Sequence, residues 1–485
     1  MFLNSIFLIL VVGILLLLLM RPTQIRFIKF VSITLSSSIL ILSTLLYLFY
    51  NKKFLTFQFF TNLFGISIDS INTDFFVGLD GISIFFFLLT SLLTFFCNIF
   101  IWNEKNFKLY ILLLFFLELL LLLTFSVLNL FLFYLFFESI LIPMFLIIGG
   151  WGSREKKIRA AYLLFFYTVC CSFLMLISII EIYSLKGTLN FEYLAYSHFS
   201  FENQIFFWLA FFLSFASKIP MFPFHIWLPE AHVEAPTIGS VFLAGILLKL
   251  GVYGFMRYSL TLFPEACIYF APFVYVLALF GIICSSFTAI KQTDLKKIIA
   301  YSSIAHMNLV VLGLFCGNLI GLEASLFQSI SHGFVASALF FLIGMLYNRY
   351  HSRLLFYYSG LTFIMPLYSF FFLFFTLFNI ALPVTCNFIG EFLLLTSIFQ
   401  ENVIVSFFAS LTVVFSGAYS LWLFNRIAFG NLKTEFIKSF KDISFSDFFI
   451  LTFLSFFSLV LGIFPNLILN ISKTGILKLF ILTTL

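Results

Sequence analysis

Apolar stretches of about 20 residues recur along almost the whole chain, and this recurrence limits its fold more than any other feature. A stretch of that length forms a helix long enough to cross the hydrocarbon core of a bilayer. Lipid offers no partner to unpaired backbone groups, so helices are the natural solution for such segments. Charged residues make up only 9% of the chain, against about 25% in a typical soluble domain. The sequence therefore predicts an all-α polytopic membrane protein.

We expect fourteen transmembrane helices, separated by short polar connections. They cover residues 2–20, 27–49, 81–102, 107–124, 126–149, 158–184, 204–231, 236–258, 266–289, 295–317, 320–347, 359–394, 403–428 and 446–468. The spans 204–231 and 359–394 are overlong and contain proline, which removes a backbone hydrogen bond and interrupts a helix. Loops are expected near 51–78 and 185–203, and a basic connection near 429–445.

The distribution of Lys and Arg supports this number of spans. The connections on one predicted side, counted with the span ends beside them, hold eighteen of the 26 basic residues, whereas the opposite side, with the C-terminal tail, holds six, Arg257 among them. The other two, Lys218 and Lys249, lie inside spans. Because loops on the cytoplasmic side carry the excess of Lys and Arg, this asymmetry predicts that both termini face the non-cytoplasmic side.

Two sets of five spans are predicted to form inverted repeats. Spans four to eight and nine to thirteen have opposite orientations because each set holds an odd number of helices, and the fourth member of each contains proline. Inverted repeats with discontinuous helices are typical of proteins that carry ions. We therefore divide the chain into N-terminal helices (1–105), a first repeat (106–259), a second repeat (266–428) and a basic connection with the last helix (429–485).

Ionisable residues occur inside several predicted spans, where they are energetically costly and usually functional. Lys218 follows an apolar run and precedes Pro220 and Pro223, and Lys249 lies more than ten positions into its span. Glu138 is a carboxylate in the middle of a span, and a partner such as Lys218 could keep it ionised. The structural alternative is a static buried ion pair, although such pairs add little net stability.

Histidines add groups that titrate near neutral pH. His306 and His332 lie inside spans and could relay protons, or could be satisfied structural histidines. Glu391 could be the terminal site of such a relay. His225 and His232 are seven residues apart, which places them on one face of a continuous helix but too far apart for two ligands of one metal ion. For this pair we favour a possible proton relay or a hydrogen bond at a helix end.

The remaining patterns give no cofactor site. The seven cysteines form no CxxC pair, and neither a G-x-G-x-x-G nor a P-loop pattern occurs. We therefore expect no metal, nucleotide, flavin or iron–sulfur centre in this chain. Glu118 stands alone in a leucine run and is left unassigned, while Asp294, Lys296 and Lys297 are expected to form a solvated cluster at the membrane interface.

The chain contains 78 phenylalanines, more than packing requires, which suggests AT-rich codons of an organellar genome. The first 20 residues agree with this interpretation, because they resemble neither a cleaved signal peptide nor an Arg-rich import sequence. We expect them to form a retained first helix.

Several stretches resemble the antiporter-like proton-pumping subunits of respiratory complex I. They run from Lys218 to Gly254 (beginning KIPMFPFHIWLPEAHVEAPT), from Gln292 to Met307 (QTDLKKIIAYSSIAHM) and from Asn387 to Phe392 (NFIGEF), and Phe137-Glu138 adds to them. The similarity covers about residues 80–430. Within this family, the glutamate at position 391 is similar to the subunit 4 group, since sister subunits usually carry lysine there.

The resemblance implies a fold and a site. It implies a fourteen-helix core with two five-helix inverted repeats, and a hydrated axis along the membrane. The axis residues would be Glu138, Lys218, Lys249, His306, His332 and Glu391.

The resemblance also implies a proton-translocating subunit of NADH:ubiquinone reductase in the inner mitochondrial membrane, with both termini on the intermembrane-space side. Redox chemistry and its cofactors (NAD, FMN, iron–sulfur clusters and ubiquinone) would belong to partner subunits, among them sister antiporter-like subunits. A cation/proton antiporter subunit and a structural membrane scaffold are the alternatives.

Overall fold

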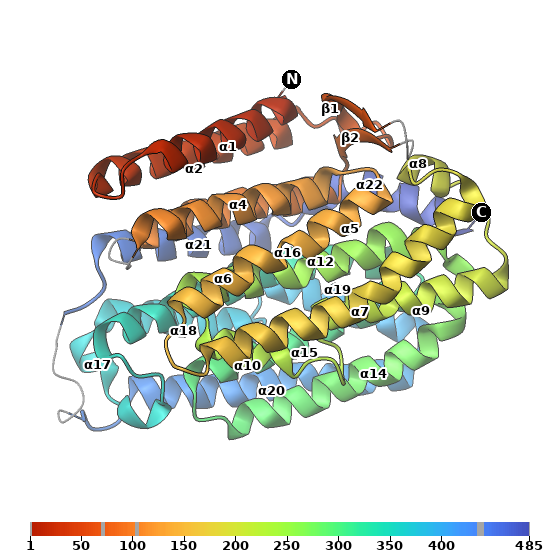
Figure 1. The fold of residues 1–485 in the computed structure, drawn as a ribbon. Helices are drawn as coiled ribbons and strands as arrows, with labels where there is room; N and C mark the ends of the chain where they lie inside the picture. The colour runs from red at the N-terminus through yellow and green to blue at the C-terminus, as the bar shows by residue number, and fades with distance from the viewer. Residues whose placement is uncertain (1, 69–72, 102–105, 434–440, 485) are drawn as a thin grey trace. The chain divides into compact units, whose positions relative to one another are not determined.

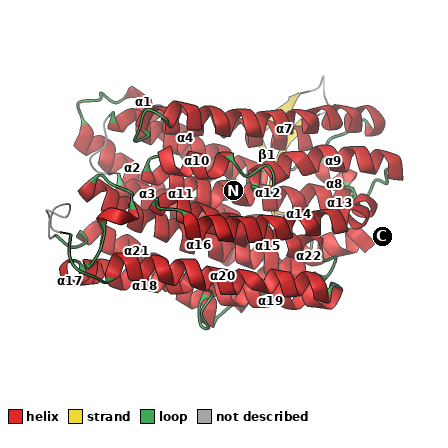
Figure 2. Ribbon diagram, turned by 90° about the horizontal axis from the view of Figure 1, so that it is seen from below, coloured by secondary structure: helices red, strands yellow, loops and turns green. Residues whose placement is uncertain are grey.

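The computed structural model describes residues 2–68, 73–101, 106–433 and 441–484. Residues 434–440 of the predicted basic connection and 69–72 of the predicted loop near 51–78 lie outside this description. The described chain consists of helices and one two-stranded sheet, which Figure 2 shows in red and yellow. This confirms the predicted polytopic helical class.

Twelve helical segments of the described chain are long and apolar enough to cross a membrane. They are α1 (Phe2–Leu19), α2 (Ile25–Phe49), α3 (Ser83–Phe100), α4 (Phe107–Ser126), α5 with α6 (Leu130–Ser139 and Leu141–Trp151), α7 (Lys157–Lys186), the segment Thr237–Leu262, α14 (Pro264–Lys291), α15 (Leu295–Phe315), α16 (Leu319–Tyr350), α20 (Val403–Ala428) and α21 (Phe445–Ile463). Each coincides with one of the fourteen predicted spans.

The other two predicted spans are those with internal proline, and the structure divides both. The first consists of α9 (Phe201–Lys218) and α10 (Trp227–Glu234), and the second of α18 (Pro366–Asn379) and α19 (Cys386–Glu401). The segment Thr237–Leu262 is irregular as well. It comprises α11 (Thr237–Phe242), the π-helix η2 (Leu243–Leu247), α12 (Leu248–Gly254), the π-helix η3 (Phe255–Ser259) and α13 (Leu260–Leu262). Shorter elements are α8 (Phe191–Leu194), the 3₁₀ turn η4 (Leu355–Tyr357) and α17 (Leu361–Ile364).

Polar side chains start several of these helices by satisfying backbone groups that have no partner within the helix. Asn129 accepts from two backbone N–H groups at the start of α5, and Asn402 does the same at α20. Ser444 and Asp447 form a capping box at the start of α21. Ser and Thr side chains inside the apolar helices donate to carbonyls three or four residues earlier, as Ser32 does to Lys29.

The chain divides into two compact units, and Figure 1 labels the helices and strands from which they are built. Unit 1 comprises Met1–Ser217, Tyr253–Tyr269 and Asn470–Leu485, and unit 2 comprises Lys218–Val252 and Phe270–Leu469. In unit 1, α1 packs against α2 and α4, and α3 packs between α2 and α4. In unit 2, α16 is buried along its length and is surrounded by α11, α15, α18, α19 and α21. The predicted inverted repeats and the four predicted chain segments stay predictions.

A β-hairpin replaces the loop that we expected near residues 51–78, so that prediction is wrong. Strands β1 (Gln58–Ile68) and β2 (Thr73–Leu79) pair antiparallel, with Thr61 opposite Val77. The hairpin is fixed to the α4–α5 connection, because Leu128 N–H donates to the carbonyl of Phe76 over 3.1 Å. A further helix, α22 (Asn466–Thr484), occupies the C-terminal tail, which we had not predicted to be helical.

Candidate functional site

Lys249 lies at a local irregularity of its helix in unit 2. It is the second residue of α12, which begins where the π-helix η2 ends, and it is fully buried. Its Nζ donates a hydrogen bond to the carbonyl oxygen of Ala244, five residues earlier and inside η2. The same Nζ lies 3.0 Å from Nδ1 of His332 on α16. Single π turns are common at functional sites, and here one supplies a carbonyl to a buried amine.

Two histidines continue from this lysine. His332 on α16 and His306 on α15 are both buried, and their ring centroids lie 5.8 Å apart at an interplanar angle of 48°. These helices pack closely against each other over much of their length. The two imidazoles are therefore neighbours because α15 and α16 present them toward one another.

Glu391 lies beyond His306. Its Oε1 is 2.9 Å from Nδ1 of His306 and accepts a hydrogen bond of 3.4 Å from the Gln328 amide. Glu391 belongs to α19, the second half of the proline-interrupted span, and α19 packs against both α15 and α16. Gln328 is held in turn by Ser331, whose hydroxyl donates to the Gln328 Oε1 over 3.2 Å.

We call Lys249, His332, His306 and Glu391 the histidine line. All four side chains are buried, all lie in unit 2, and each lies next to the following one. Each can exist with or without a proton, and imidazole does so near neutral pH. The line is therefore a set of successive proton acceptors and donors inside an apolar helical bundle. The structure brings together these four predicted site residues.

The two remaining predicted histidines lie in different surroundings. His232 on α10 is fully buried, and its ring stacks on Phe340 with centroids 4.7 Å apart. His225 precedes α10, is half-buried, and stacks on Phe222 with centroids 5.5 Å apart. Our expectation that the two share one helical face is wrong, because residues 219–226 are not helical and α10 begins only at Trp227.

Glu138 and Lys218 are placed on separate units. Glu138 is the penultimate residue of α5 in unit 1, and its carboxylate oxygens are buried. Lys218 ends α9, is buried, and is the first residue of unit 2. Their pairing therefore stays a prediction.

An ion pair in unit 1 was missed by the sequence analysis. Arg257 had been counted only among the basic residues of the less basic side, but it lies in η3, is buried, and places Nη2 2.6 Å from Oδ1 of Asp80. Its guanidinium also stacks over the rings of Phe57 and Phe191, at 4.9 and 5.2 Å from their centroids. Burial raises the pKa of Asp80. The charge of Arg257 and the hydrogen bonds from Arg257 and Ser83 lower it by more than burial raises it, so the pKa of Asp80 lies below its ordinary value.

A second group of buried charges corrects an expectation. Asp294 and Lys296 are buried rather than solvated, and only Lys297 of that sequence cluster is half-exposed. The segment around Arg353 covers them, since Leu295 N–H donates to the Arg353 carbonyl over 3.0 Å. This covering segment is distant in sequence, so local composition gave no signal for it.

Glu118 is a buried carboxylate with a defined partner. Its Oε1 accepts a hydrogen bond of 2.7 Å from the Thr94 hydroxyl on α3. The contact joins α3 and α4, which is the role that the sequence left unassigned.

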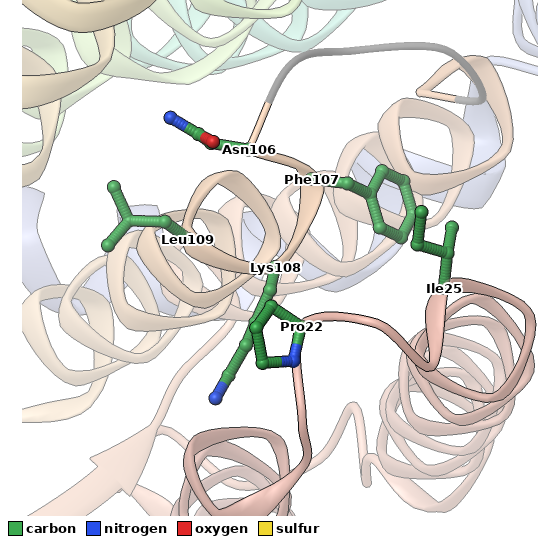
Figure 3. Close-up of a pocket in the computed structure, with 6 residues that line it drawn as sticks. All are labelled: Pro22, Ile25, Asn106, Phe107, Lys108 and Leu109. Atoms are coloured by element: carbon green, nitrogen blue, oxygen red, sulfur yellow. The ribbon is translucent and has the colours of Figure 1, made fainter.

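The described residues contain no group of three or more His, Cys, Asp and Glu that could hold a metal ion. A pocket of about 440 Å³ opens in unit 1 at the α1–α2 turn (Figure 3). Phe107 and Ile25 face each other across it. Lys108 lines the pocket, and its Nζ donates to the carbonyls of Leu18 and Met20, so it caps the end of α1.

Comparison with known proteins decides the family. The family model described as "NADH:quinone oxidoreductase/Mrp antiporter, TM" matches residues 127–416. A protein of Chondrus crispus named NADH-ubiquinone oxidoreductase chain 4 is 51% identical over 91% of this chain and 89% of its own length. Proteins of the same name from Marchantia polymorpha and Arabidopsis thaliana are each 48% identical over the same shares. The chain belongs to the NADH-ubiquinone oxidoreductase chain 4 family.

Solved structures agree with this membership. Respiratory complex I from Thermus thermophilus contains a chain that matches all of this one with a TM-score of 0.90 and 27% identity, over 99% of that chain. The Mrp complex from Dietzia shares the fold, with a TM-score of 0.86 and 19% identity over 99% of this chain and 97% of that one. As a member of the chain 4 family, this protein is a proton-pumping membrane-arm subunit of complex I and lies among other antiporter-like subunits.

Proposed function

We propose that the histidine line carries the proton through unit 2, and that Lys249, His332, His306 and Glu391 take it up in this order. The observation that supports the proposal is the unbroken succession of four buried titratable side chains, with 3.0 Å between Lys249 and His332 and 2.9 Å between His306 and Glu391. Charged groups that only hold helices together can do so as isolated ion pairs. Four titratable side chains in series are suited to passing a proton from one to the next.

Each step moves one proton to a neighbour with a free lone pair. Protonated Lys249 donates to Nδ1 of neutral His332 and becomes a neutral amine. His332 passes a proton on to His306 and returns to its neutral form, and His306 gives its proton to the carboxylate of Glu391. The rings are 5.8 Å apart by their centroids, so the middle step needs a ring rotation or a bridging water.

The apolar surroundings give these steps their control. Coulomb interactions are several times stronger between buried charges than between charges in water. A proton that reaches His306 is therefore attracted by ionised Glu391, and a proton on Glu391 removes that attraction. Gln328 donates a hydrogen bond to Oε1 of Glu391 and so holds this carboxylate beside His306. A change in the position of α19 would alter this balance.

The other predicted roles belong to the same proposal. Glu138 would modulate Lys218, which would feed Lys249, and His225 and His232 would be further relay groups. Redox chemistry would take place in partner subunits that hold NAD, FMN, iron–sulfur clusters and ubiquinone, and this chain would hold no cofactor. We also propose that the protein lies in the inner mitochondrial membrane, is organelle-encoded and has both termini on the intermembrane-space side.

The test is Lys249→Met in the assembled complex reconstituted into vesicles. Methionine has a similar length but cannot hold a proton, so the number of protons pumped per electron should fall. NADH oxidation with a soluble artificial acceptor serves as the control for assembly. If Lys249→Met pumps at the full proton-to-electron ratio, the proposal is wrong and the structural membrane scaffold is favoured. Transport that depends on sodium would favour a cation/proton antiporter subunit.

A further inference from the structure

The pocket at the α1–α2 turn lies where three membrane spans of unit 1 end. α1 ends at Leu19, α2 begins at Ile25 and α4 begins at Phe107. The pocket has a volume of about 440 Å³, and its lining comes from the α1–α2 turn and from the starts of α2 and α4 (Figure 3). The ends of membrane spans lie at the level of the lipid headgroups. A ligand in this pocket would therefore have its polar part among those headgroups.

Lys108 places a fixed positive charge at this pocket. Its Nζ donates a hydrogen bond of 2.8 Å to the carbonyl oxygen of Leu18 and one of 2.6 Å to that of Met20. Within the described residues these carbonyls are its hydrogen-bond acceptors, and an ammonium group has three N–H donors. The end of α1 thus holds the ammonium group in place and leaves it one donor for an anion.

The segments that line the pocket carry further positive charge. Arg21 and Arg26 are exposed, and each is next in sequence to a residue of the lining. Lys29 lies one turn after Ile25 on α2, and its Nζ is 5.2 Å from the ring centroid of Phe107 in the pocket wall. No acidic residue lies between these three cations in the sequence, and the first turns of α2 and α4 contain none either. This charge favours an anionic ligand.

An apolar stripe leads from the pocket along α4 into the membrane. It consists of Leu109, Leu112, Leu113 and Phe116, which recur at the spacing of one helical face. None of the four is buried, and Leu109 and Phe116 are 55% and 39% exposed. Because Leu109 also lines the pocket, a molecule with a charged head and an apolar chain can cover both surfaces. A phosphate ion would cover only the pocket.

We infer that this pocket binds the phosphate group of an anionic phospholipid, with Lys108, Arg21 and Arg26 around the headgroup and an acyl chain along the α4 stripe. Basic pockets between membrane helices suit anionic headgroups, and the starts of α2 and α4 add the positive ends of two helix dipoles. A lipid bound there joins α1, α2 and α4 at their ends. The site belongs to unit 1 and is separate from the histidine line in unit 2. The alternative is that the basic residues only orient the spans in the membrane.

The test uses the assembled complex in vesicles that contain a small fraction of a phospholipid with a photoreactive acyl chain. After illumination, mass spectrometry identifies the labelled peptides. Photoreactive phosphatidylglycerol should label residues 106–116 at least about fivefold more than photoreactive phosphatidylcholine, since each basic residue near an anionic headgroup contributes about fivefold. Equal labelling by the two lipids would show an ordinary lipid-facing surface and would overturn the inference. Loss of labelling on addition of inorganic phosphate would overturn it too, in favour of a free-phosphate site.

Removing charge tests the headgroup contacts. The double variant Arg21→Gln/Arg26→Gln should lower labelling by phosphatidylglycerol by about 25-fold, which is about fivefold for each arginine. The matched control is Lys52→Gln/Lys53→Gln, which removes the same charge just beyond the other end of α2 and should label as the wild type does. Unchanged labelling in the arginine variant would contradict the assignment.

A second variant keeps the test decisive if the arginine variant does not assemble. Leu109→Glu places a carboxylate in the pocket, where it repels a phosphate group. An acidic residue suits the first turn of a helix, so folding of α4 should not suffer. Labelling by phosphatidylglycerol should fall at least about fivefold, whereas the neutral control Leu109→Gln should keep most of it. Full labelling in Leu109→Glu would overturn the inference.

Discussion

Nδ1 of His306 lies 2.9 Å from Oε1 of Glu391, and both side chains are buried in unit 2. A buried carboxylate and a buried imidazole at this distance share their charge states, because a charge on either one favours the opposite charge on the other. The pair joins α15 to α19, the second half of an interrupted span. Removing the carboxylate while keeping its shape is therefore the most direct way to test the end of the histidine line.

We expect Glu391→Gln to reduce the number of protons pumped per electron while the complex still assembles. The amide keeps the size of the side chain and can still meet Gln328, but it cannot take up a proton from His306. The proton-to-electron ratio in vesicles measures the effect, and Glu391→Asp is the control that keeps the carboxylate. A ratio equal to that of the wild type in Glu391→Gln would show that Glu391 is not the terminal group.

We expect Asp80→Asn to destabilise the protein by about 3–5 kcal/mol, the usual cost of breaking one partner out of a buried pair. The cost arises because Arg257 keeps its charge while losing its neighbour at 2.6 Å. Rates of heat inactivation in detergent measure it. Lys297→Ala is the comparison, since its half-exposed pair with Glu230 should contribute only about 0–1 kcal/mol.

The same pair gives a dependence on pH. The pKa of Asp80 is lowered on folding, so its contribution to stability is complete above the ordinary aspartate pKa of about 3.9. It is lost as the pH falls below that value through the lowered pKa of the folded state. The difference in inactivation rate between wild type and Asp80→Asn should therefore shrink in acid. A difference that stays constant over this range would contradict the assignment.

Gly390 allows the close approach of α19 to α16. A Cβ at this position would overlap the Gln328 side chain and lie 3.0 Å from its Cα. We expect Gly390→Ala to cost about 1–3 kcal/mol, typical of overpacking, and to lower pumping by displacing Glu391. Gly149→Ala is the control, because no atom lies within 4 Å of the added Cβ there. Thermal inactivation and the proton-to-electron ratio should change together in Gly390→Ala alone.

Thr94 donates a hydrogen bond to Oε1 of the buried carboxyl group of Glu118. We expect Thr94→Val to destabilise the α3–α4 contact by about 1–3 kcal/mol, because it leaves a buried polar group without its donor. Glu118→Gln should cost less, since its amide oxygen can accept the same hydrogen bond. Heat-inactivation rates of the two variants decide the matter, and equal rates would contradict this account.

The helical class could be predicted from the sequence because lipid leaves the backbone few choices, and apolar length alone marks a span. The individual members of the histidine line could be predicted for a similar reason: a titratable group in an apolar run is rarely accidental. Their order could not be predicted, since it depends on how α12, α15, α16 and α19 pack. Four positions without periodicity in common became neighbours only in three dimensions.

The failures share a physical cause. Asp80 and Arg257 meet across a large sequence separation, and each lies at or next to the end of a predicted span, where a charged residue is ordinary. Asp294 and Lys296 were expected in solvent because the covering segment at Arg353 is remote in sequence. The β1–β2 hairpin was missed because pairing between strands, and not the composition of either strand, defines it. His225 was placed on the helical face of His232 because their seven-residue spacing was counted along a continuous helix, whereas the proline-rich stretch before Trp227 is not helical.

The π-helix η2 has a consequence for how Lys249 can move. A π turn holds one residue more than an α turn, and each residue of a helix advances about 100° around its axis. If this extra residue migrated along the chain past position 249, the Lys249 side chain would swing by about 100° although the ends of the segment stayed in place. Only a few backbone hydrogen bonds would be exchanged. In the segment Thr237–Leu262, such a migration would therefore redirect the Lys249 side chain without moving the whole helix along its axis.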